Sequence, residues 1–173
     1  MKKVLIIVFV LAIQFANAQV NRNLGDFDEV KVFDKITVKL IAANENKMVI
    51  TGSRADEVES VNKNGELKIR MPFPKLLSGD DIVVNLYFKN LESISVSEGS
   101  FVSSEADFKQ TTLDLNAKSG GEIKLVLDVY KVNVKAYAGG IVSISGKATN
   151  QNVTITSGGI LNAKFFHSLQ TSI

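Results

Sequence analysis

The chain has 173 residues, 45% of them hydrophobic and 22% charged, with one histidine and no cysteine. All 18 acidic residues follow residue 18, and 18 basic residues remain there once Lys2 and Lys3 are set aside, so this part carries no net charge. This balance argues against a nucleic-acid partner, and the lack of cysteine leaves no standard zinc site or thiol nucleophile. We therefore expect no cofactor and no metal.

The first element in chain order is an export signal. Lys2 and Lys3 precede ten apolar residues at 4–13, and Ala16-Asn17-Ala18 has the small-x-small pattern of a cleavage site. The apolar run is shorter than the ~20 residues that span a bilayer. We expect residues 1–18 to be a cleaved signal peptide and residues 19–173 to form one exported domain. That domain has no membrane span, and it resides in the periplasm, on the outer-membrane surface or outside the cell.

Residues 27–90 predict an irregular β part that caps the domain. Strands are expected over 27–33, 35–42, 47–52, 66–71 and 82–89, where apolar and polar residues alternate or β-branched residues gather. Ser53 resembles the N-cap of a short helix over Ala55–Val61. Two prolines predict a loop near residues 72–81.

Residues 91–173 are periodic. Gly99, Gly120, Gly139 and Gly158 follow one another at steps of 21, 19 and 19 residues, and apolar residues recur at the same positions in each interval. Columns of like apolar residues at a constant step indicate stacked repeats. Because apolar and polar residues alternate within each interval, the sequence predicts an all-β, single-stranded β-solenoid with coils of 19–21 residues.

The glycines predict the corners of these coils. A corner can require positive φ, which glycine adopts at little cost, and stacked corners leave little room for a Cβ. A phosphate-binding loop would instead need a helix after the glycines, and strands lie on both sides here. The expected structural corners are Gly99, Gly120, Gly121, Gly139, Gly140, Gly158 and Gly159.

Outward positions of neighbouring coils also align and form polar columns. One interpretation is an ordinary solvated sheet face. The other is a flat, shallow binding face for a glycan or protein ligand, formed by Asn116, Lys118, Lys135, Tyr137, Thr154 and Thr156.

Catalytic residues are sparse. Counting back by 19 places His167 over Ala148, as a wall residue rather than a catalytic base. Asp80 and Asp81 are adjacent in a loop, but a glycosidase holds its two carboxyl groups apart across a cleft, which short coils do not build. The sequence therefore predicts that the protein is not an enzyme.

The whole pattern resembles the head-GIN-domain family, described as auto-transporter adhesins of Bacteroidota. The resemblance rests on "GDFDEVKVFDKITVKLIAANENKMVITG", "NGELKIRM", "NLESISVSEGS" and the glycine-pair repeats, and it covers residues 25–166. It implies a right-handed β-helix-like fold, export and an adhesin role, and it brings no catalytic residues. Members of that family continue through further glycine-rich coils, so we expect this chain to be truncated at its C-terminal end.

Three functions remain open at this point. The first is an adhesin-like surface or envelope binding protein. The second is a structural envelope protein that self-associates through an open C-terminal coil over residues 160–173, where spacing predicts that Phe165 faces inward over Gly146. The third is a carbohydrate-active β-helix enzyme.

Overall fold

The computed structural model describes residues 19–173, which form twelve β-strands and, within that range, no helix. The predicted signal peptide, residues 1–18, lies outside the described residues. In chain order the strands are β1 (Val20–Asn23), β2 (Glu29–Val32), β3 (Thr37–Ala42), β4 (Lys47–Thr51), β5 (Glu59–Lys63), β6 (Glu66–Arg70), β7 (Val83–Phe88), β8 (Ser93–Val96), β9 (Phe101–Lys118), β10 (Glu122–Tyr137), β11 (Ile141–Ile155) and β12 (Ile160–Ser172).

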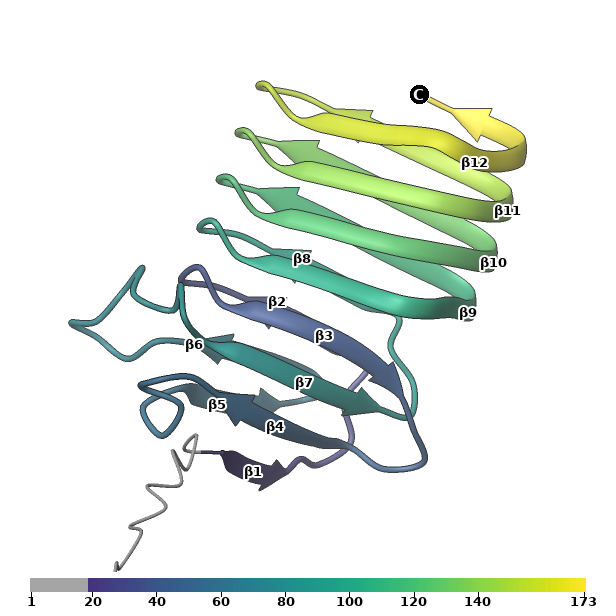
Figure 1. Cartoon of the computed structure of the whole chain (residues 1–173). Helices are drawn as coiled ribbons and strands as arrows, with labels where there is room; N and C mark the ends of the chain where they lie inside the picture. Colours follow the sequence, from purple (N-terminus) through teal and green to yellow (C-terminus); the bar gives the residue numbers. More distant parts are fainter. Residues whose placement is uncertain (1–18) are drawn as a thin grey trace, which may run out of the picture.

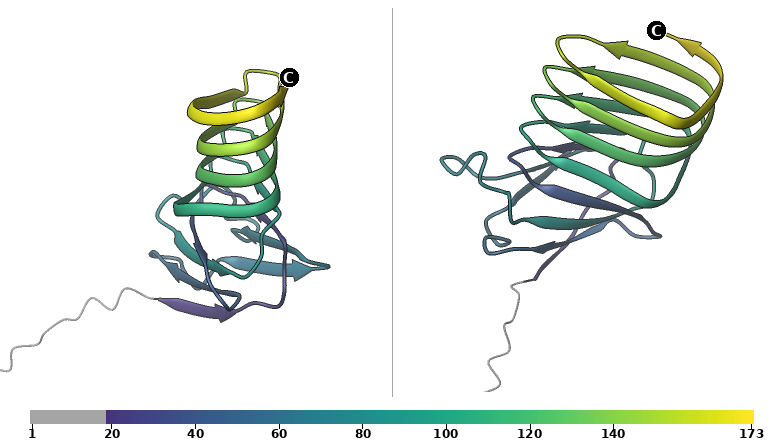
Figure 2. Two further views of the ribbon diagram at one scale, coloured as in Figure 1. Left: turned by 90° about the vertical axis from the view of Figure 1, so that its right-hand side faces the viewer. Right: turned by 45° about the horizontal axis from the view of Figure 1, so that its top comes forward.

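The strands wind into a β-solenoid, as the sequence predicts (Figure 1). One flank is stacked in the order β1-β4-β7-β3-β9 and the other in the order β5-β6-β2-β8-β9, and β10 to β12 continue the stack in parallel. In Figure 1 the chain runs left to right along the near flank and returns along the far flank as it rises, so the solenoid is right-handed. Each coil is an elongated loop with a tight turn at one end and a broad bend at the other (Figure 2).

The predicted inward columns are confirmed by the register of the parallel strands. Alternation with period two sends every second side chain into the coil, where it stacks on its equivalents above and below. Val134, Ala136 and Val142 are buried, and Lys135 between the first two is exposed. The aligned columns are Val102, Ile123, Val142 and Leu161; Ile94, Leu115, Val134 and Val153; and Val96, Ala117, Ala136 and Ile155. At the top of the third column Ile155 is 43% exposed, so burial ends there with Ala136.

A tight turn with two residues of positive φ connects the flanks in each coil above that of β6 and β7. In one such turn Ser119 has a φ of 49° and Gly120 a φ of 73°, and the Gly121 amide donates to the Lys118 carbonyl at 2.8 Å. Positive φ at both central residues is the requirement of a type I′ turn. The same pair of conformations occurs at Glu98-Gly99, Ala138-Gly139 and Ser157-Gly158.

The second glycine of each pair is required by close contact between coils. A Cβ built on Gly140 would lie 2.1 Å from the Ala117 carbonyl oxygen, and one on Gly121 would lie 2.4 Å from the Val96 carbonyl oxygen. Neither distance leaves room for a side chain without moving the backbone. The two glycines of a pair therefore occupy their positions for different physical reasons.

Residues 27–90 are more regular than the sequence predicts. β2 pairs in parallel with β8, and β3 pairs with β9, at a constant offset of 64 residues, so β2 and β3 form a further coil. The tight turn of this coil is Asp34-Lys35, where both residues have a φ of 64°. β6 and β7 form the coil beneath it. Only the lowest layer departs from the parallel pattern, because β1, β4 and β5 pair antiparallel and close that end.

The short helix predicted over Ala55–Val61 is wrong. Residues 53–57 form turns, and β5 begins at Glu59. Ser53, which was expected to cap the helix, donates its amide and its hydroxyl to the Asp81 carboxylate instead. From Glu59 onward, the antiparallel ladder between β5 and β6 satisfies the backbone hydrogen-bonding groups. Pairing between strands therefore overrides the weak helix preference of this segment.

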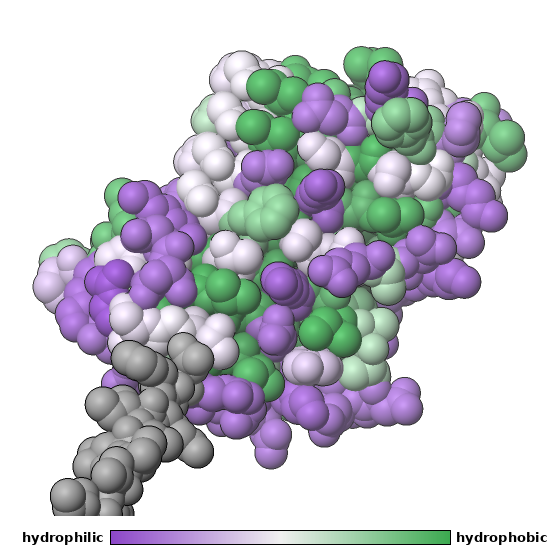
Figure 3. Space-filling model, in the orientation of Figure 1, coloured by the Kyte–Doolittle hydropathy of each residue, from purple (hydrophilic) through white to green (hydrophobic). Residues whose placement is uncertain are grey.

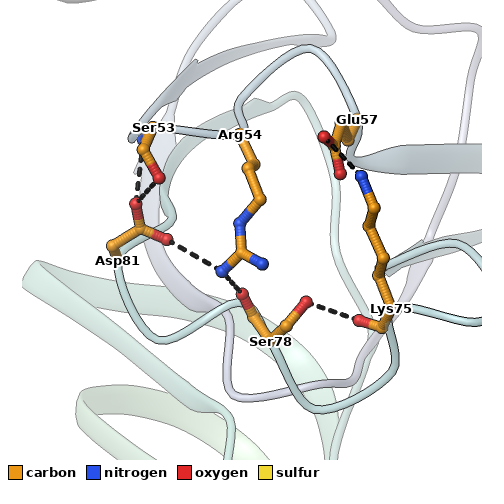
Figure 4. A network of polar contacts seen from close by, with 6 residues as sticks. All are labelled: Ser53, Arg54, Glu57, Lys75, Ser78 and Asp81. Atoms are coloured by element: carbon orange, nitrogen blue, oxygen red, sulfur yellow. Dashed lines mark hydrogen bonds and ion pairs between the residues drawn. The ribbon is translucent and has the colours of Figure 1, made fainter.

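The loop over residues 71–82 projects beside the tight turns and is held by polar contacts (Figure 4). The Arg54 guanidinium donates to the Ser78 carbonyl and lies 3.6 Å from a carboxylate oxygen of Asp81. The Lys75 amine lies 2.7 Å from Glu57. These contacts fix the loop to the turn at residues 53–57.

The upper end of the stack carries a β-bulge that changes the expected register. Between Ser143 and Ser145 of β11, the partner in β12 passes from Asn162 to Phe165, so β12 has one extra residue there. Phe166 consequently packs against the core, whereas Phe165 is 69% exposed. The prediction that Phe165 faces inward is wrong, because a constant step of 19 does not allow for a bulge.

Candidate binding face

Outward side chains on the far flank in Figure 1 form parallel columns across six strands, which we call the polar face. Pairing in register aligns equivalent positions of β6, β2 and β8 with the later halves of β9, β10 and β11. The polar face consists of Glu66, Glu29, Ser93, Asp114, Asn133 and Asn152; of Lys68, Lys31, Ser95, Asn116, Lys135 and Thr154; and of Lys118, Tyr137 and Thr156 beside them.

The structure places all six residues of the predicted binding face on this flank. Asn116, Lys135 and Thr154 are aligned in one column, and Lys118 is paired with Tyr137 in the next. A groove of about 780 Å³ crosses the face, and its lining includes Asn116, Lys118, Lys135 and Thr154. Tyr137 and Thr156 lie outside the lining of this groove. Four of the six predicted residues are therefore grouped around one hollow.

A ladder of side-chain hydrogen bonds runs along the edge of the groove. The Asn152 amide donates to the Asn133 side-chain oxygen at 2.8 Å, and the Asn133 amide donates to the Asp114 carboxylate. Each residue lies 19 positions after the last. Asp114, Asn133 and Asn152 recur at the same step as the glycines, and this step is the signal in the sequence that corresponds to the ladder. The ladder fixes three polar side chains and so gives the groove one rigid wall.

The lower end of the polar face is a compact set of opposite charges. The Lys31 amine contacts Glu66 and lies 3.3 Å from Glu29, and Lys68 lies 2.9 Å from Glu66. The hydrogen bond to Glu66 raises the pKa of Lys31. The hydrogen bonds from Lys31 and Lys68 lower the pKa of Glu66. The opposite charges neutralise one another. Because these side chains remain partly exposed, the ion pairs add little stability.

The upper end of the polar face carries two lysines outside the ion pairs, although the charge of Lys118 acts on the Glu98 carboxyl and opposes the rise of its pKa that desolvation causes. Neither Lys118 nor Lys135 forms an ion pair with any of residues 19–173. The Lys135 amine lies 5.2 Å from the centroid of the Tyr137 ring, within the range of a cation–π contact. The side-chain oxygen of Asn116 is buried and makes no hydrogen bond. The accessible groups of the upper face are thus two lysine donors and one aromatic ring, because the Asn116 oxygen is buried.

The residues considered for catalysis lie apart from this face. His167 pairs with Lys147, not with Ala148 as the 19-residue count predicts, because of the bulge in β12. Asp81 belongs to the polar contacts of the loop, and the hydrogen bond from the Ser53 hydroxyl lowers the pKa of its carboxyl. Within residues 19–173, no group of three histidine, aspartate or glutamate side chains is placed to hold a metal ion.

Two further observations concern the whole described chain. Across residues 19–173 there is no helix with the length and hydrophobicity needed to cross a bilayer. Residues 26–173 match the family described as "Putative auto-transporter adhesin, head GIN domain". No curated protein matches the sequence.

Several solved structures share the fold at low sequence identity. A putative adhesin from Bacteroides fragilis is 16% identical with a TM-score of 0.80, covering 88% of this chain and 73% of that one. A putative adhesin from Parabacteroides merdae is 15% identical with a TM-score of 0.69, covering 89% and 75%. A protein from Parabacteroides distasonis, described as a putative lipid binding protein, is 13% identical with a TM-score of 0.60, covering 88% and 76%.

Proposed function

The chain belongs to the family of putative auto-transporter adhesins with a head GIN domain, and we propose that it is an exported, non-enzymatic binding module of the bacterial envelope or exterior. The amino-terminal segment, with its basic, apolar and small-residue regions, supports export. Mass spectrometry of the exported protein should find a chain that begins at Gln19. Retention of residues 1–18 would contradict the signal peptide.

The observation that carries the binding role is the upper half of the polar face. Lys118 and Lys135 form no ion pair with any of residues 19–173. The Asp114–Asn133–Asn152 ladder holds the adjacent wall in place. A rigid polar surface loses little conformational entropy when a ligand binds, which favours affinity. We infer that a glycan or protein ligand contacts Asn116, Lys118, Lys135, Tyr137, Thr154 and Thr156.

A glycan array and a pull-down of surface proteins, each with the purified chain, would test this role. Replacing Lys135 and Tyr137 together by alanine should abolish the strongest binding signal, because it removes a cation and the aromatic ring of the polar face. Both side chains lie outside the core, so the fold should remain intact. The matched control is Lys109→Ala, an exposed lysine outside the lining of the groove. Equal binding by both variants would refute a role for the polar face.

Self-assembly is the second candidate, and one observation favours it. β12 pairs only with β11 among the described strands, and Phe165, Leu169 and Ile173 on or beside it are largely exposed. An unpaired strand edge with apolar side chains is a template for pairing with another chain. The two candidates are compatible, since the upper end and the polar face are different surfaces.

A further inference from the structure

The near flank in Figure 1 carries a trough between two bulged coils, which we call the bulge trough. Ser103 of β9 pairs with Lys124 of β10, and the next pair is Asp107 with Val126. Three residues of β9, 104–106, therefore lie opposite the single residue Leu125. In β12 two residues, Ala163 and Lys164, stand opposite Ile144. β10 and β11 lie between these bulged strands and pair with each other without a shift. Bulges concentrate beside binding and active sites, where they re-aim side chains.

The floor of the trough is two strands wide, which is about 10 Å at the usual spacing of strands. The hollow has a volume of about 550 Å³. It lies on the flank opposite the polar face. Figure 3 shows this side of the molecule, where hydrophobic residues (green) lie among hydrophilic (purple) and intermediate (white) ones over the upper coils. A site here would therefore be independent of the polar face.

Two columns of outward side chains line the trough and differ in chemistry. The first supplies hydrogen-bonding groups, and the Asn162 amide already donates to the Ser143 hydroxyl at 3.2 Å. The second is less polar and ends in the exposed ring of Phe165. The first column is Ser103, Lys124, Ser143 and Asn162. The second is Val126, Ser145 and Phe165, and it continues below the trough into Asp107, which is outside the lining.

Phe165 is exposed because of the bulge. Without the extra residue in β12, this ring would lie in the inward register over Gly146, the place that Phe166 takes. Because neighbouring residues of a strand face opposite sides, one ring of the pair Phe165–Phe166 faces inward in either register, and the bulge determines that the exposed ring is Phe165. The Lys164 amine lies 5.3 Å from the centroid of the ring. The trough thus has an aromatic wall with a positive charge beside it.

We propose that the bulge trough binds a pyranose ring that carries a carboxylate, as in a uronic acid unit of a glycan. The apolar face of the ring lies against Phe165 and Val126, and its hydroxyl groups meet Ser143, Ser145 and Asn162. The carboxylate lies between Lys124 and Lys164, neither of which forms an ion pair with any of residues 19–173. A few placed polar groups in a mostly apolar hollow are what fix a small ligand's orientation.

The charge of Glu105 determines which way the carboxylate of the bound sugar points. Glu105 is exposed on the bulge of β9 and belongs to the lining of the trough at the wall opposite Phe165. Like charges repel, so the carboxylate of the sugar is directed away from Glu105 and toward the two lysines. Charge complementarity therefore selects an acidic sugar over a neutral one, and it gives the bound ring one orientation.

The test is titration of the purified chain with tetragalacturonate, followed by calorimetry and by amide chemical shifts. We expect binding with shifts centred on residues 143–145 and 162–165. The methyl ester of the same tetramer keeps the rings and removes the charges, and it should bind at least about tenfold more weakly, since a hydrogen bond to a charged group contributes about 1.5–3 kcal/mol. Tetraglutamate keeps the charges without the rings, and it should not bind.

Variants of the wall separate ring contact from charge. Phe165→Ala should weaken tetragalacturonate binding at least about tenfold, the scale of a 1.4 kcal/mol loss, while Phe165→Tyr should retain it. Tyr130→Ala, another exposed aromatic residue on the solenoid, is the control for a general loss of surface rings. Lys124→Gln with Lys164→Gln should weaken binding of the acid and leave the ester unchanged. Equal binding of tetraglutamate, unchanged binding by Phe165→Ala, or no shifts in the trough would each overturn the proposal.

Discussion

Gly139 and Gly140 are neighbours in one turn but meet different constraints. Gly139 has a φ of 75°, and a Cβ built on it would find its nearest atom 4.0 Å away. Gly140 has no such φ, but its Cβ would collide with the Ala117 carbonyl oxygen at 2.1 Å. The sequence predicts both as corner glycines from their 19-residue step. It could not separate the two roles, because close approach between coils is visible only in three dimensions.

Alanine substitutions should therefore rank these two glycines. Gly139→Ala forces a left-handed conformation on an alanine, which costs about 1–2 kcal/mol. Gly140→Ala requires the coil below to move, and overpacking of this kind typically costs about 1–3 kcal/mol or more. We expect denaturant unfolding to show the larger loss for Gly140→Ala. Equal losses, or a larger loss for Gly139→Ala, would contradict the contact argument.

Glu98 is an acidic residue in an unfavourable setting. It lies in the tight turn next to that of Asp34, and the Lys35 amide donates to the Glu98 carbonyl at 3.0 Å. Glu98 is exposed, but partial desolvation of its carboxyl and secondly the neighbouring Asp34 raise the pKa of this group, while Lys118 opposes the rise. A carboxyl whose pKa is higher in the folded state favours folding when it is protonated, so stability is lost as the pH rises through the folded-state pKa.

The variant Glu98→Gln should therefore be more stable than the unmodified chain at pH 7, where Glu98 is ionised. The advantage should disappear below the ordinary pKa of a glutamate, where the carboxyl is protonated in both folded and unfolded states. The measurement is the difference in melting temperature between the two proteins across this pH range, since the difference cancels the other titrating groups. A difference independent of pH would show that packing, not charge, is responsible.

At the scale of single elements, the strands were predicted better than their order in the stack. The expected strands over 27–33, 35–42 and 47–52 correspond to β2, β3 and β4. Their alternation is a local property, so the sequence displays it. The pairing of β2 with β8 is not local, since 64 residues separate the partners. The coils of β2–β3 and β6–β7 therefore do not appear as repeats with a step near 19 residues. The helix was predicted wrongly because β5 forms only through its partner β6.

The loop over residues 71–82 depends on one buried carboxylate. Asp34 is 1% exposed, and its two oxygens accept hydrogen bonds from the amides of Met71 at 2.9 Å and Leu77 at 2.8 Å. Asparagine has one acceptor oxygen in place of two and would direct an N–H group at an amide. Asp34→Asn should therefore destabilise the protein by about 1–3 kcal/mol, the cost of an unsatisfied buried group.

Hydrogen exchange measures this effect where it arises. The amides of Met71 and Leu77 should exchange faster in Asp34→Asn, while amides of β10 and β11 remain protected. The control is Asp80→Asn, an exposed residue of the same loop. Unchanged protection of both amides would show that the loop is held mainly by Arg54 and Lys75 instead.

At the scale of the whole molecule, the candidate site was predicted in part. The residues of the upper polar face are one or two coils apart, so a 19-residue step aligns them. The ion pairs below them involve β2 and β6, whose partners Lys31 and Glu66 are 35 residues apart, and no repeat in the sequence connects them. The bulge trough was also missed. The step of 21 residues records the two extra residues of β9 without locating them. The extra residue of β12 follows the last glycine pair of the sequence, so no change in spacing reveals it.

The two ends of the solenoid differ, and this difference leads to a prediction of self-association. The lower end is closed by the antiparallel strands β1, β4 and β5. At the upper end β12 pairs on one side only among the described strands, and Leu169 is 83% exposed. Two copies related by a two-fold axis across this end would pair their β12 strands antiparallel, which gives a closed, isologous dimer.

We expect sedimentation equilibrium to show a monomer–dimer exchange that depends on protein concentration. Leu169→Lys places a charge at the edge, which is how natural sheets prevent such pairing, and should shift the population to monomer. Tyr130→Lys adds the same charge to an exposed position of β10 and should leave the dimer intact. A chain that remains monomeric at every concentration, with amides of residues 160–172 protected from exchange, would show that β12 is stable as a free edge.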